Sequence, residues 1–157
     1  MNKKTVGKLA AGRALGLVDI ENLVGASTIS ERQVAEIHEA FRAVVKPGPR
    51  DQFYVAASHH NQAAAAFGWP NGQHQFLSGE DGADYLLVKK AIDVLNAGGY
   101  DHVYVATGDN ALAPYVTYLM EAGIKVTIVA KHRGFSHWMA ENGADIIWLD
   151  SEFELAA

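Results

Sequence analysis

Three aspartates that lie far apart in the sequence are the residues best placed to do chemistry. Asp19 ends one apolar run, Asp109 follows another, and Asp84 stands in the first turn of a long segment with helical periodicity. In parallel α/β sheets, the residues that bind ligands gather at the carboxyl ends of the strands. Converging carboxylates repel one another, and a hard divalent cation with oxygen ligands relieves that repulsion. The three positions therefore predict a site for Mg²⁺ or Mn²⁺.

Each of these acids also has a purely structural interpretation. Acids near the start of a helix cap free backbone N–H groups and suit the helix dipole, and for one aspartate alone this is the more common role. Two features favour function. An uncompensated carboxylate at the end of an apolar strand, as at Asp19, is costly to bury, and three such acids recur at one predicted edge. Zinc fits less well because it prefers His or Cys ligands, and the chain has no cysteine.

The elements that must position these acids alternate along the chain. Strands are predicted at residues 15–20, 52–56, 102–106, 125–129 and 145–149, and helices at residues 30–44, 82–96, 110–122 and 136–142. Residues 57–76 show no clear period and are predicted to be irregular. The alternation is typical of an α/β fold with a mostly parallel, here five-stranded, sheet. A length of 157 residues without a Pro/Gly/Ser-rich linker predicts one domain over residues 1–157.

Composition excludes several classes of protein. The absence of cysteine excludes disulfides and thiolate nucleophiles, and nothing points to an oxidising compartment. The apolar stretch after Met1 is broken by Lys8, Arg13 and Asp19, so it does not resemble a signal peptide. No run of about 18 apolar residues predicts a membrane span. We expect a cytoplasmic protein without a membrane partner.

The distribution of charge matters more than its sum. A formal charge of −5 argues at first against a nucleic-acid binder, whose usual footprint is strongly basic. Residues 1–13 and residues 125–137, however, hold seven of the 13 Lys and Arg and no acid. The second segment follows the fourth predicted strand and so lies at the same edge as the aspartates. A solvated loop is the plain alternative, but the position favours a phosphate-binding role for Lys131, His132, Arg133, Ser136 and His137.

Other polar and aromatic residues carry weaker signals. Lys89 and Lys90 would either line the entrance to the site or lie on the exposed face of their helix. Residues 58–61 are interpreted as a polar loop, with contact to RNA as the alternative. Aromatic side chains can stack on bases, but in a domain of this size they are mostly core, and this is the interpretation we give to Trp69, Phe76, Trp138 and Trp148.

Four motifs, in the same order along the chain, resemble the NYN domain family of PIN-like metal-dependent ribonucleases. The strongest is the strand and turn of residues 100–114, with Thr107-Gly-Asp-Asn110, followed by the glycine and strand of residues 123–126. Residues 17–23, Leu-Val-Asp-Ile-Glu-Asn-Leu, match the family's opening Asp-x-x-Asn strand end. Gly82-Ala-Asp84 is similar to its Gly-x-Asp helix start, and residues 135–149 to its closing segment. From the first motif to the last, the match spans residues 17–149, nearly the whole chain.

The resemblance implies a fold, a reaction and a set of site residues. The fold is a three-layer α/β/α sandwich of PIN-like type. Asp19, Asp84 and Asp109 become catalytic metal ligands, and the bound Mg²⁺ or Mn²⁺ activates a water to attack an RNA phosphodiester. The expected substrate is single-stranded RNA, and a homodimer is left open. The supporting residues are Glu21, Asn22, Thr107, which replaces the family's serine, and Asn110.

The chain departs from the family pattern at several positions. Ala111 replaces the second acid of the family's Ser-Gly-Asp-x-Asp-Phe turn, and Leu112 replaces its phenylalanine. Lys89-Lys90 stand where the family often has another acid, and Glu21 is a candidate to replace one lost carboxylate. Fewer acids mean weaker metal binding, so a weakened or inactive PIN-like module that binds nucleic acid is the main alternative.

Two further functions fit the residues less well. A phosphotransfer or receiver-like domain would use a strand-end aspartate as phosphate acceptor, but neither Asp19 nor Asp109 has the neighbours expected for that role. A dinucleotide-binding fold requires G-x-G-x-x-G after the first strand. The residues there are Asp-Ile-Glu-Asn-Leu-Val-Gly, which excludes it.

Overall fold

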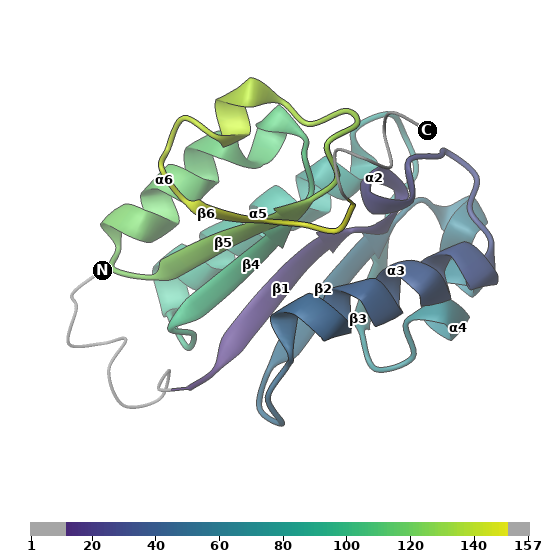
Figure 1. The fold of residues 1–157 in the computed structure, drawn as a ribbon, viewed down its shortest axis with the longest axis horizontal. Coiled ribbons are helices and arrows are strands. Elements are labelled where there is room, and N and C mark those ends of the chain that lie inside the picture. The colour runs from purple at the N-terminus through teal and green to yellow at the C-terminus, as the bar shows by residue number, and fades with distance from the viewer. Residues whose placement is uncertain (1–11, 151–157) are drawn as a thin grey trace.

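The computed structural model describes residues 12–150 and contains one six-stranded sheet. Every neighbouring pair of strands is parallel, and the order across the sheet is β3-β2-β1-β4-β5-β6 (Figure 1). The order reverses between β1 and β4, which is where open α/β sheets bind ligands. The strands are β1 (Ala14–Asp19), β2 (Gln52–Ala57), β3 (Gln73–Phe76), β4 (His102–Ala106), β5 (Lys125–Ala130) and β6 (Asp145–Trp148).

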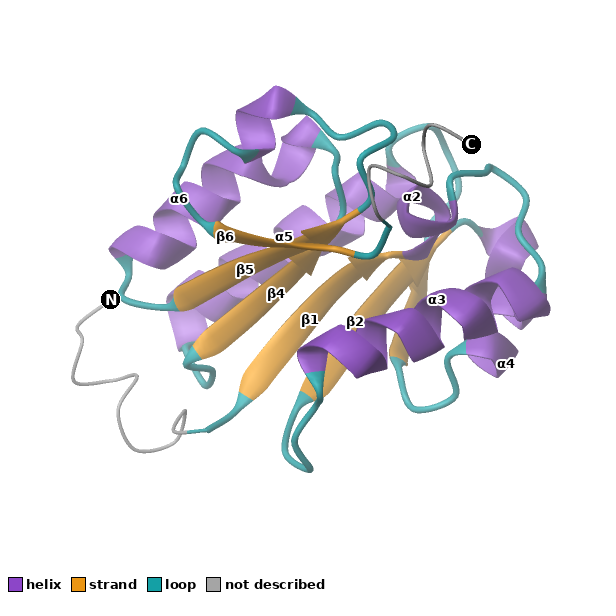
Figure 2. Ribbon diagram, viewed as in Figure 1, coloured by secondary structure: helices purple, strands orange, loops and turns teal. Residues whose placement is uncertain are grey.

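Helices cover both faces of this sheet, so the predicted three-layer α/β/α architecture is confirmed (Figure 2). The long helices α3 and α5 lie on opposite faces. Two short 3₁₀ turns connect a strand to the helix that follows, and a third lies between β5 and β6. The helices are α2 (Ile20–Val24), α3 (Glu31–Val45), α4 (Gln62–Gly68), α5 (Gly82–Ala97) and α6 (Ala113–Glu121), and the 3₁₀ turns are η1 (His59–Asn61), η2 (Asn110–Leu112) and η3 (His137–Met139).

Two apolar clusters, one on each face of the sheet, form the core. On one face, Leu17 of β1 packs with Leu87 of α5 and Leu119 of α6. On the other, Phe41 of α3 packs against Trp69, which follows α4. Because β1 lies between the two clusters, all of its residues are buried. The strand that carries Asp19 is thus fixed from both sides, and the free energy of apolar burial fixes where its carboxyl end lies.

The start of α3 follows directly from its sequence. The Ser30 hydroxyl accepts from the Gln33 backbone N–H, and the Gln33 side chain accepts from the Ser30 N–H, which completes a capping box. The predicted apolar face is confirmed at its first three positions, since Val34, Ile37 and Phe41 are buried. Val44, expected on the same face, is 40% exposed, and the neighbouring Val45 packs against the core instead.

The sheet has six strands rather than the five predicted, and residues 57–76 are not irregular. They contain η1, α4 and the edge strand β3. The sequence of β3, Gln-His-Gln-Phe, has no apolar run because an edge strand is half exposed and is paired on one side only. The alanine-rich sequence of α4 favours a helix by propensity alone, without the apolar period of 3.6 residues that we looked for.

Smaller differences occur at the ends of three predicted elements. Ile20, expected in the first strand, begins α2. The helix predicted at residues 110–122 begins as η2 and continues as α6, whose second residue, Pro114, suits a first helical turn. The helix predicted at residues 136–142 is only the turn η3. No helix of residues 12–150 is long and apolar enough to cross a membrane. Of the basic segment 1–13, residues 1–11 lie outside the described residues.

Candidate functional site

The structure brings the three aspartates to one cleft at the carboxyl ends of the strands. Asp19, Asp84 and Asp109 all line this cleft, which has a volume of about 470 Å³. They come from the end of β1, the first turn of α5 and the turn after β4. We call this the acidic cleft. Its other lining residues are Glu21, Asn22, Ser27, Ser58, His60, Ser78, Gly79, Glu80 and Ala83.

Asp19 is fixed by the turn from β1 into α2. The residue is only 7% exposed, and its Oδ1 accepts a hydrogen bond from the backbone N–H of Asn22 at 3.1 Å, which caps α2. The Asn22 side chain in turn accepts from the backbone N–H of Gly108 at 2.9 Å. Asn22 therefore ties the end of β1 to the turn after β4, and so holds Asp19 and Asp109 in a fixed relation.

Asp109 is fixed by a second cap, at the end of β4. Its Oδ1 accepts from the backbone N–H of Ala111 at 2.9 Å, which caps η2. Its own N–H donates to the hydroxyl of Thr107 at 3.2 Å, and Thr107 is fully buried. The threonine that replaces the family's serine thus holds the turn through its hydroxyl. Ala111, at the position of the lost acid, is half-buried against the core.

Asp84 depends on the close approach of α5 to the strand end before it. A Cβ at Gly82, the first residue of the helix, would collide with the carbonyl oxygen of Leu77. Only glycine allows this helix to start where it does, and the start places Asp84 in the first turn, which is the position expected from the Gly-Ala-Asp motif. Leu87 on the following turn anchors the helix in the core.

Two carboxyl groups of the cleft, those of Asp19 and Asp84, have raised pKa values. Burial raises the pKa of Asp19 to about 7, and the charges of Asp84, Glu21 and Asp109 add to this effect against the lowering by the Asn22 N–H. Burial, followed by the charges of Asp109 and Asp81, raises the pKa of Asp84 to about 6. No Lys or Arg is among the residues that line the cleft. The cleft therefore holds negative charge that its own side chains do not compensate.

The donor chemistry of the cleft fits a hard divalent cation, because it offers carboxylate oxygens and no thiolate. The geometry is less complete. Within residues 12–150, no three carboxylate, imidazole or thiolate groups converge closely enough to hold a metal ion in this conformation. A cation bound between Asp19, Asp84 and Asp109 would have to draw these side chains together or keep several of its waters, as Mg²⁺ commonly does.

Glu21 lines the cleft, but hydrogen bonds within the protein hold its carboxylate. Oε1 accepts from the backbone N–H of Ser58 at 3.0 Å and from its hydroxyl at 3.1 Å. Oε2 accepts from the side-chain amide of the buried Asn61. These bonds join the end of β1 to the turn after β2. These contacts give Glu21 a positioning role in the cleft, and its role as a replacement for a lost acid stays a prediction.

Two cations of the basic segment line a second hollow next to the acidic cleft. This hollow, of about 730 Å³, is lined by Lys131 and Arg133 and shares Glu21, Asn22 and Ser27 with the cleft. Glu36 and Asp150 also line it, so that with Glu21 its wall holds three acids beside the two cations. We call it the Lys131 hollow. The segment is attached to the site by Ser136, whose backbone N–H donates to the carbonyl oxygen of Gly108 at 2.9 Å. The expected position of this segment, at the same edge as the acids, is the position that the structure gives it.

The remaining predicted binding residues lie away from the cleft. The ring of His132 stacks on Trp148 at 3.9 Å and its Nδ1 is 3.1 Å from Asp150, so its contacts are structural. His137 is exposed in η3 beside Trp138. The ammonium of Lys90 lies 5.5 Å from the centre of the Tyr54 ring. Neither Lys89 nor Lys90 is among the residues that line the cleft, and Asn110 lines a different cavity.

Sequence reasoning missed one wall of the acidic cleft. Ser78, Gly79 and Glu80 line it from the turn that follows β3. Because the sequence of β3 has no recognisable strand pattern, its carboxyl end was not predicted to contribute residues to the site. The available signal was the Ser-Gly-Glu-Asp-Gly turn directly before the Gly-Ala-Asp motif.

Two comparisons relate the chain to known proteins. A family model described as the NYN domain matches residues 14–148. The fold is similar to the crystal structure of a protein of unknown function from Vibrio parahaemolyticus, with a TM-score of 0.66 and 14% sequence identity over 88% of this chain and 93% of that chain. No curated protein matches the sequence. The structural match shows similarity of fold only. The match to the family model includes all the residues that line the acidic cleft.

Proposed function

Because the chain belongs to the NYN domain family, part of the PIN-like nuclease superfamily, we propose that it is a metal-dependent ribonuclease. The observation that carries this proposal is the acidic cleft. Three aspartates from separate elements line it, two of their pKa values are raised, and no cation of the protein is among its lining residues. Uncompensated negative charge of this kind is what a divalent cation relieves.

Asp19, Asp84 and Asp109 would hold the cation, Mg²⁺ or Mn²⁺. The caps of α2 and η2 use only Oδ1 of Asp19 and of Asp109, which leaves Oδ2 of each for a ligand. A divalent cation there supplies a more acidic bound water and offsets the negative charge that develops on a phosphodiester during attack. Asn22 and Thr107 act by holding the two turns in place, since neither contributes an acidic group.

The two cations of the Lys131 hollow would hold the RNA backbone. Lys131 and Arg133 lie on the wall of this hollow, and the residues that it shares with the acidic cleft make the two surfaces continuous. A strand crossing both would place one phosphate at the aspartates and others at the cations. A formal charge of −5 does not exclude RNA binding in this arrangement, because phosphates need cations only at the points where they contact the protein.

Cleavage of labelled single-stranded RNA of mixed sequence tests the proposal. We expect cleavage products with Mn²⁺ or Mg²⁺ and none when the metal is removed with EDTA. RNA that remains intact with either metal, while the chain still binds it, would refute the ribonuclease. That result would favour the second candidate, a nucleic-acid-binding module. Two observations support this candidate: Ala111 stands in place of the family's acid, and residues 12–150 contain no preformed metal cluster.

Removal of the two cations is expected to weaken RNA binding measured in EDTA. Each phosphate contact that is lost should reduce the slope of log K against log salt by about 0.7 for single strands. The double variant Lys131→Ala/Arg133→Ala is therefore expected to have a slope shallower by about 1.4. Lys125→Ala is the matched control, because this exposed lysine begins β5 at the opposite edge of the sheet. Equal slopes for the double variant and the wild type would exclude these residues from the phosphate path.

A further inference from the structure

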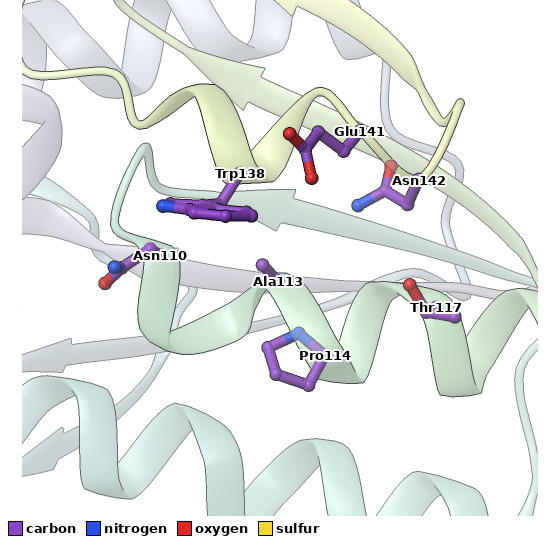
Figure 3. Close-up of a pocket in the computed structure, with 7 residues that line it drawn as sticks. All are labelled: Asn110, Ala113, Pro114, Thr117, Trp138, Glu141 and Asn142. Carbon is purple, nitrogen blue, oxygen red and sulfur yellow. The ribbon is translucent and has the colours of Figure 1, made fainter.

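A separate cavity lies on the α6 side of the Asp109 turn (Figure 3). It has a volume of about 400 Å³, within the range of roughly 300–1,000 Å³ usual for small-molecule sites. Asn110, the residue after Asp109, lines this cavity while Asp109 itself lines the acidic cleft. The two sites are thus neighbours on either side of one turn. The remaining lining residues are Ala113, Pro114, Thr117, Trp138, Glu141 and Asn142.

Trp138 gives this cavity an aromatic wall that the fold does not need for its core. Its side chain is 53% exposed, although we expected a core position from the sequence. The neighbouring Met139 is fully buried and supplies the apolar anchor of η3 instead. In Figure 3 the indole ring lies across from Ala113 and Pro114 of α6, so the cavity opens between a flat aromatic surface and small side chains. A planar ring fits such a space.

Asn142 carries a hydrogen-bond donor that has no partner. Its Oδ1 accepts from the backbone N–H of Ala144 at 3.0 Å, which fixes the orientation of the amide, because an N–H can donate only to the oxygen. The Nδ2 group is buried and has no hydrogen-bond partner in the part of the chain that the structure describes. Figure 3 shows this nitrogen on the side of the cavity. Buried donors are almost always paired, but this nitrogen has almost no accessible surface, so a ligand in the cavity does not reach it in this conformation.

Glu141 adds a carboxylate at the same place. The residue is exposed, and in Figure 3 its carboxylate projects from the segment after η3 toward the space beside Trp138. The cavity therefore combines a stacking surface with a pair of acceptor oxygens. Unpaired bases of RNA are recognised by this combination of stacking and hydrogen bonds to the base edge.

We propose that this cavity binds one unstacked base of the RNA, with guanine preferred. Guanine presents two adjacent donors, N1–H and N2–H, which match the two oxygens of the Glu141 carboxylate. Adenine, cytosine and uracil each present fewer adjacent donors on that edge. The inference rests on the proposed function in that it takes RNA as the ligand, but it concerns a site separate from the aspartates. It assigns the chain a base preference beside the point of cleavage.

Binding in EDTA to the fluorescein-labelled oligonucleotides UUGUU and UUAUU tests this site without cleavage. We expect the wild type to bind UUGUU about 10-fold more tightly than UUAUU, which is the effect of one bidentate base contact. Binding of UUGUU should also quench tryptophan fluorescence. Trp138→Ala should weaken binding of UUGUU about 10-fold, the effect of losing one stacked base, whereas Trp138→Phe retains most of it. Glu141→Gln should abolish the preference between the two oligonucleotides.

Matched controls separate the site from general effects of mutation. Tyr118→Ala removes an exposed aromatic side chain of α6, and Glu121→Gln removes an exposed carboxylate of the same helix. Both residues lie outside the cavity. Both should bind as the wild type does. GMP should compete more weakly than UUGUU, and GMP binding as tight as UUGUU would overturn the assignment to RNA. Unchanged affinity in Trp138→Ala, or an unchanged preference in Glu141→Gln, would overturn the site.

The outcome for this site is distinguishable from that for the proposed function. A chain that binds UUGUU through Trp138 but never cleaves RNA would refute the ribonuclease and leave the base site standing. A chain that cleaves RNA while Trp138→Ala binds and cleaves normally would refute the base site alone.

Discussion

Replacing Asp109 by asparagine is expected to abolish metal-dependent cleavage of RNA while leaving the fold intact. Asparagine keeps the side-chain oxygen that accepts from the Ala111 N–H, so the cap of η2 survives. What is lost is the negative charge that would bind the cation. Since outer-shell partners of a metal already account for roughly 10–100-fold in activity, loss of a direct ligand should cost at least about 100-fold.

The measurement is the initial rate of cleavage of labelled single-stranded RNA with Mn²⁺, with thermal unfolding as the check on folding. Asp93→Asn is the matched control, because this exposed aspartate lies on α5 outside the acidic cleft. It should retain full activity. If Asp109→Asn cleaves RNA nearly as fast as the wild type, the carboxylate of Asp109 does not hold a catalytic metal.

Replacing Asp19 by asparagine is expected to stabilise the metal-free protein at pH 8. At this pH the buried carboxylate is charged although its pKa is raised to about 7, so the fold carries the cost of that charge. Asparagine keeps the acceptor for the Asn22 N–H and removes the charge. A rise of about three pKa units corresponds to about 4 kcal/mol at most. We expect a gain in unfolding free energy on the order of 2–4 kcal/mol.

The pH dependence has a defined sign. The pKa of Asp19 in the folded protein lies above that of an unfolded aspartate, near 3.8. Its contribution to the unfolding free energy is therefore fully present below pH 4, where the carboxyl is protonated, and is lost as the pH rises toward 7. The pKa of Asp84, raised to about 6, acts in the same direction. In EDTA, the wild type should therefore lose stability between pH 4 and pH 7, and Asp19→Asn should lose less.

With added Mn²⁺, the wild type should become more stable than Asp19→Asn at pH 8, because a cation that binds only the folded protein stabilises it. We expect Mn²⁺ to raise the unfolding temperature of the wild type at pH 8 and to leave that of Asp19→Asn nearly unchanged. Chemical denaturation in EDTA and thermal unfolding with Mn²⁺ measure the two effects. An Asp19→Asn protein that is less stable than the wild type at pH 8 in EDTA would contradict the uncompensated charge.

The fold was predictable where burial leaves a pattern in the sequence. The apolar runs that form β1, β4 and β5 identify the central strands, and Ser30 with Gln33 marks the start of α3. The edge strand β3 was not predicted because alternate residues of this short strand are exposed and it is paired on one side only, so its polar sequence resembles a loop. The wall of the cleft formed by residues 78–80 was missed for the same reason.

The convergence of the three aspartates was predictable because topology alone brings the carboxyl ends of parallel strands to one edge. The partners of individual side chains were not. The contacts of Glu21 with Ser58 and Asn61, and the stacking of His132 on Trp148, depend on packing between segments far apart in the sequence. The exposure of Trp138 follows from η3 being a short turn, which the apolar pattern of residues 135–142 does not reveal.

Diffraction from crystals soaked in Mn²⁺, recorded for the anomalous signal of manganese, tests the central claim most directly. We predict an anomalous peak between the carboxylates of Asp19, Asp84 and Asp109, at roughly 2.0–2.2 Å from at least one oxygen of each, distances typical of small divalent cations with oxygen ligands. The same peak should vanish in crystals of Asp109→Asn. Well-ordered carboxylates with no manganese between them would contradict the account and leave the chain as a binding module of this fold.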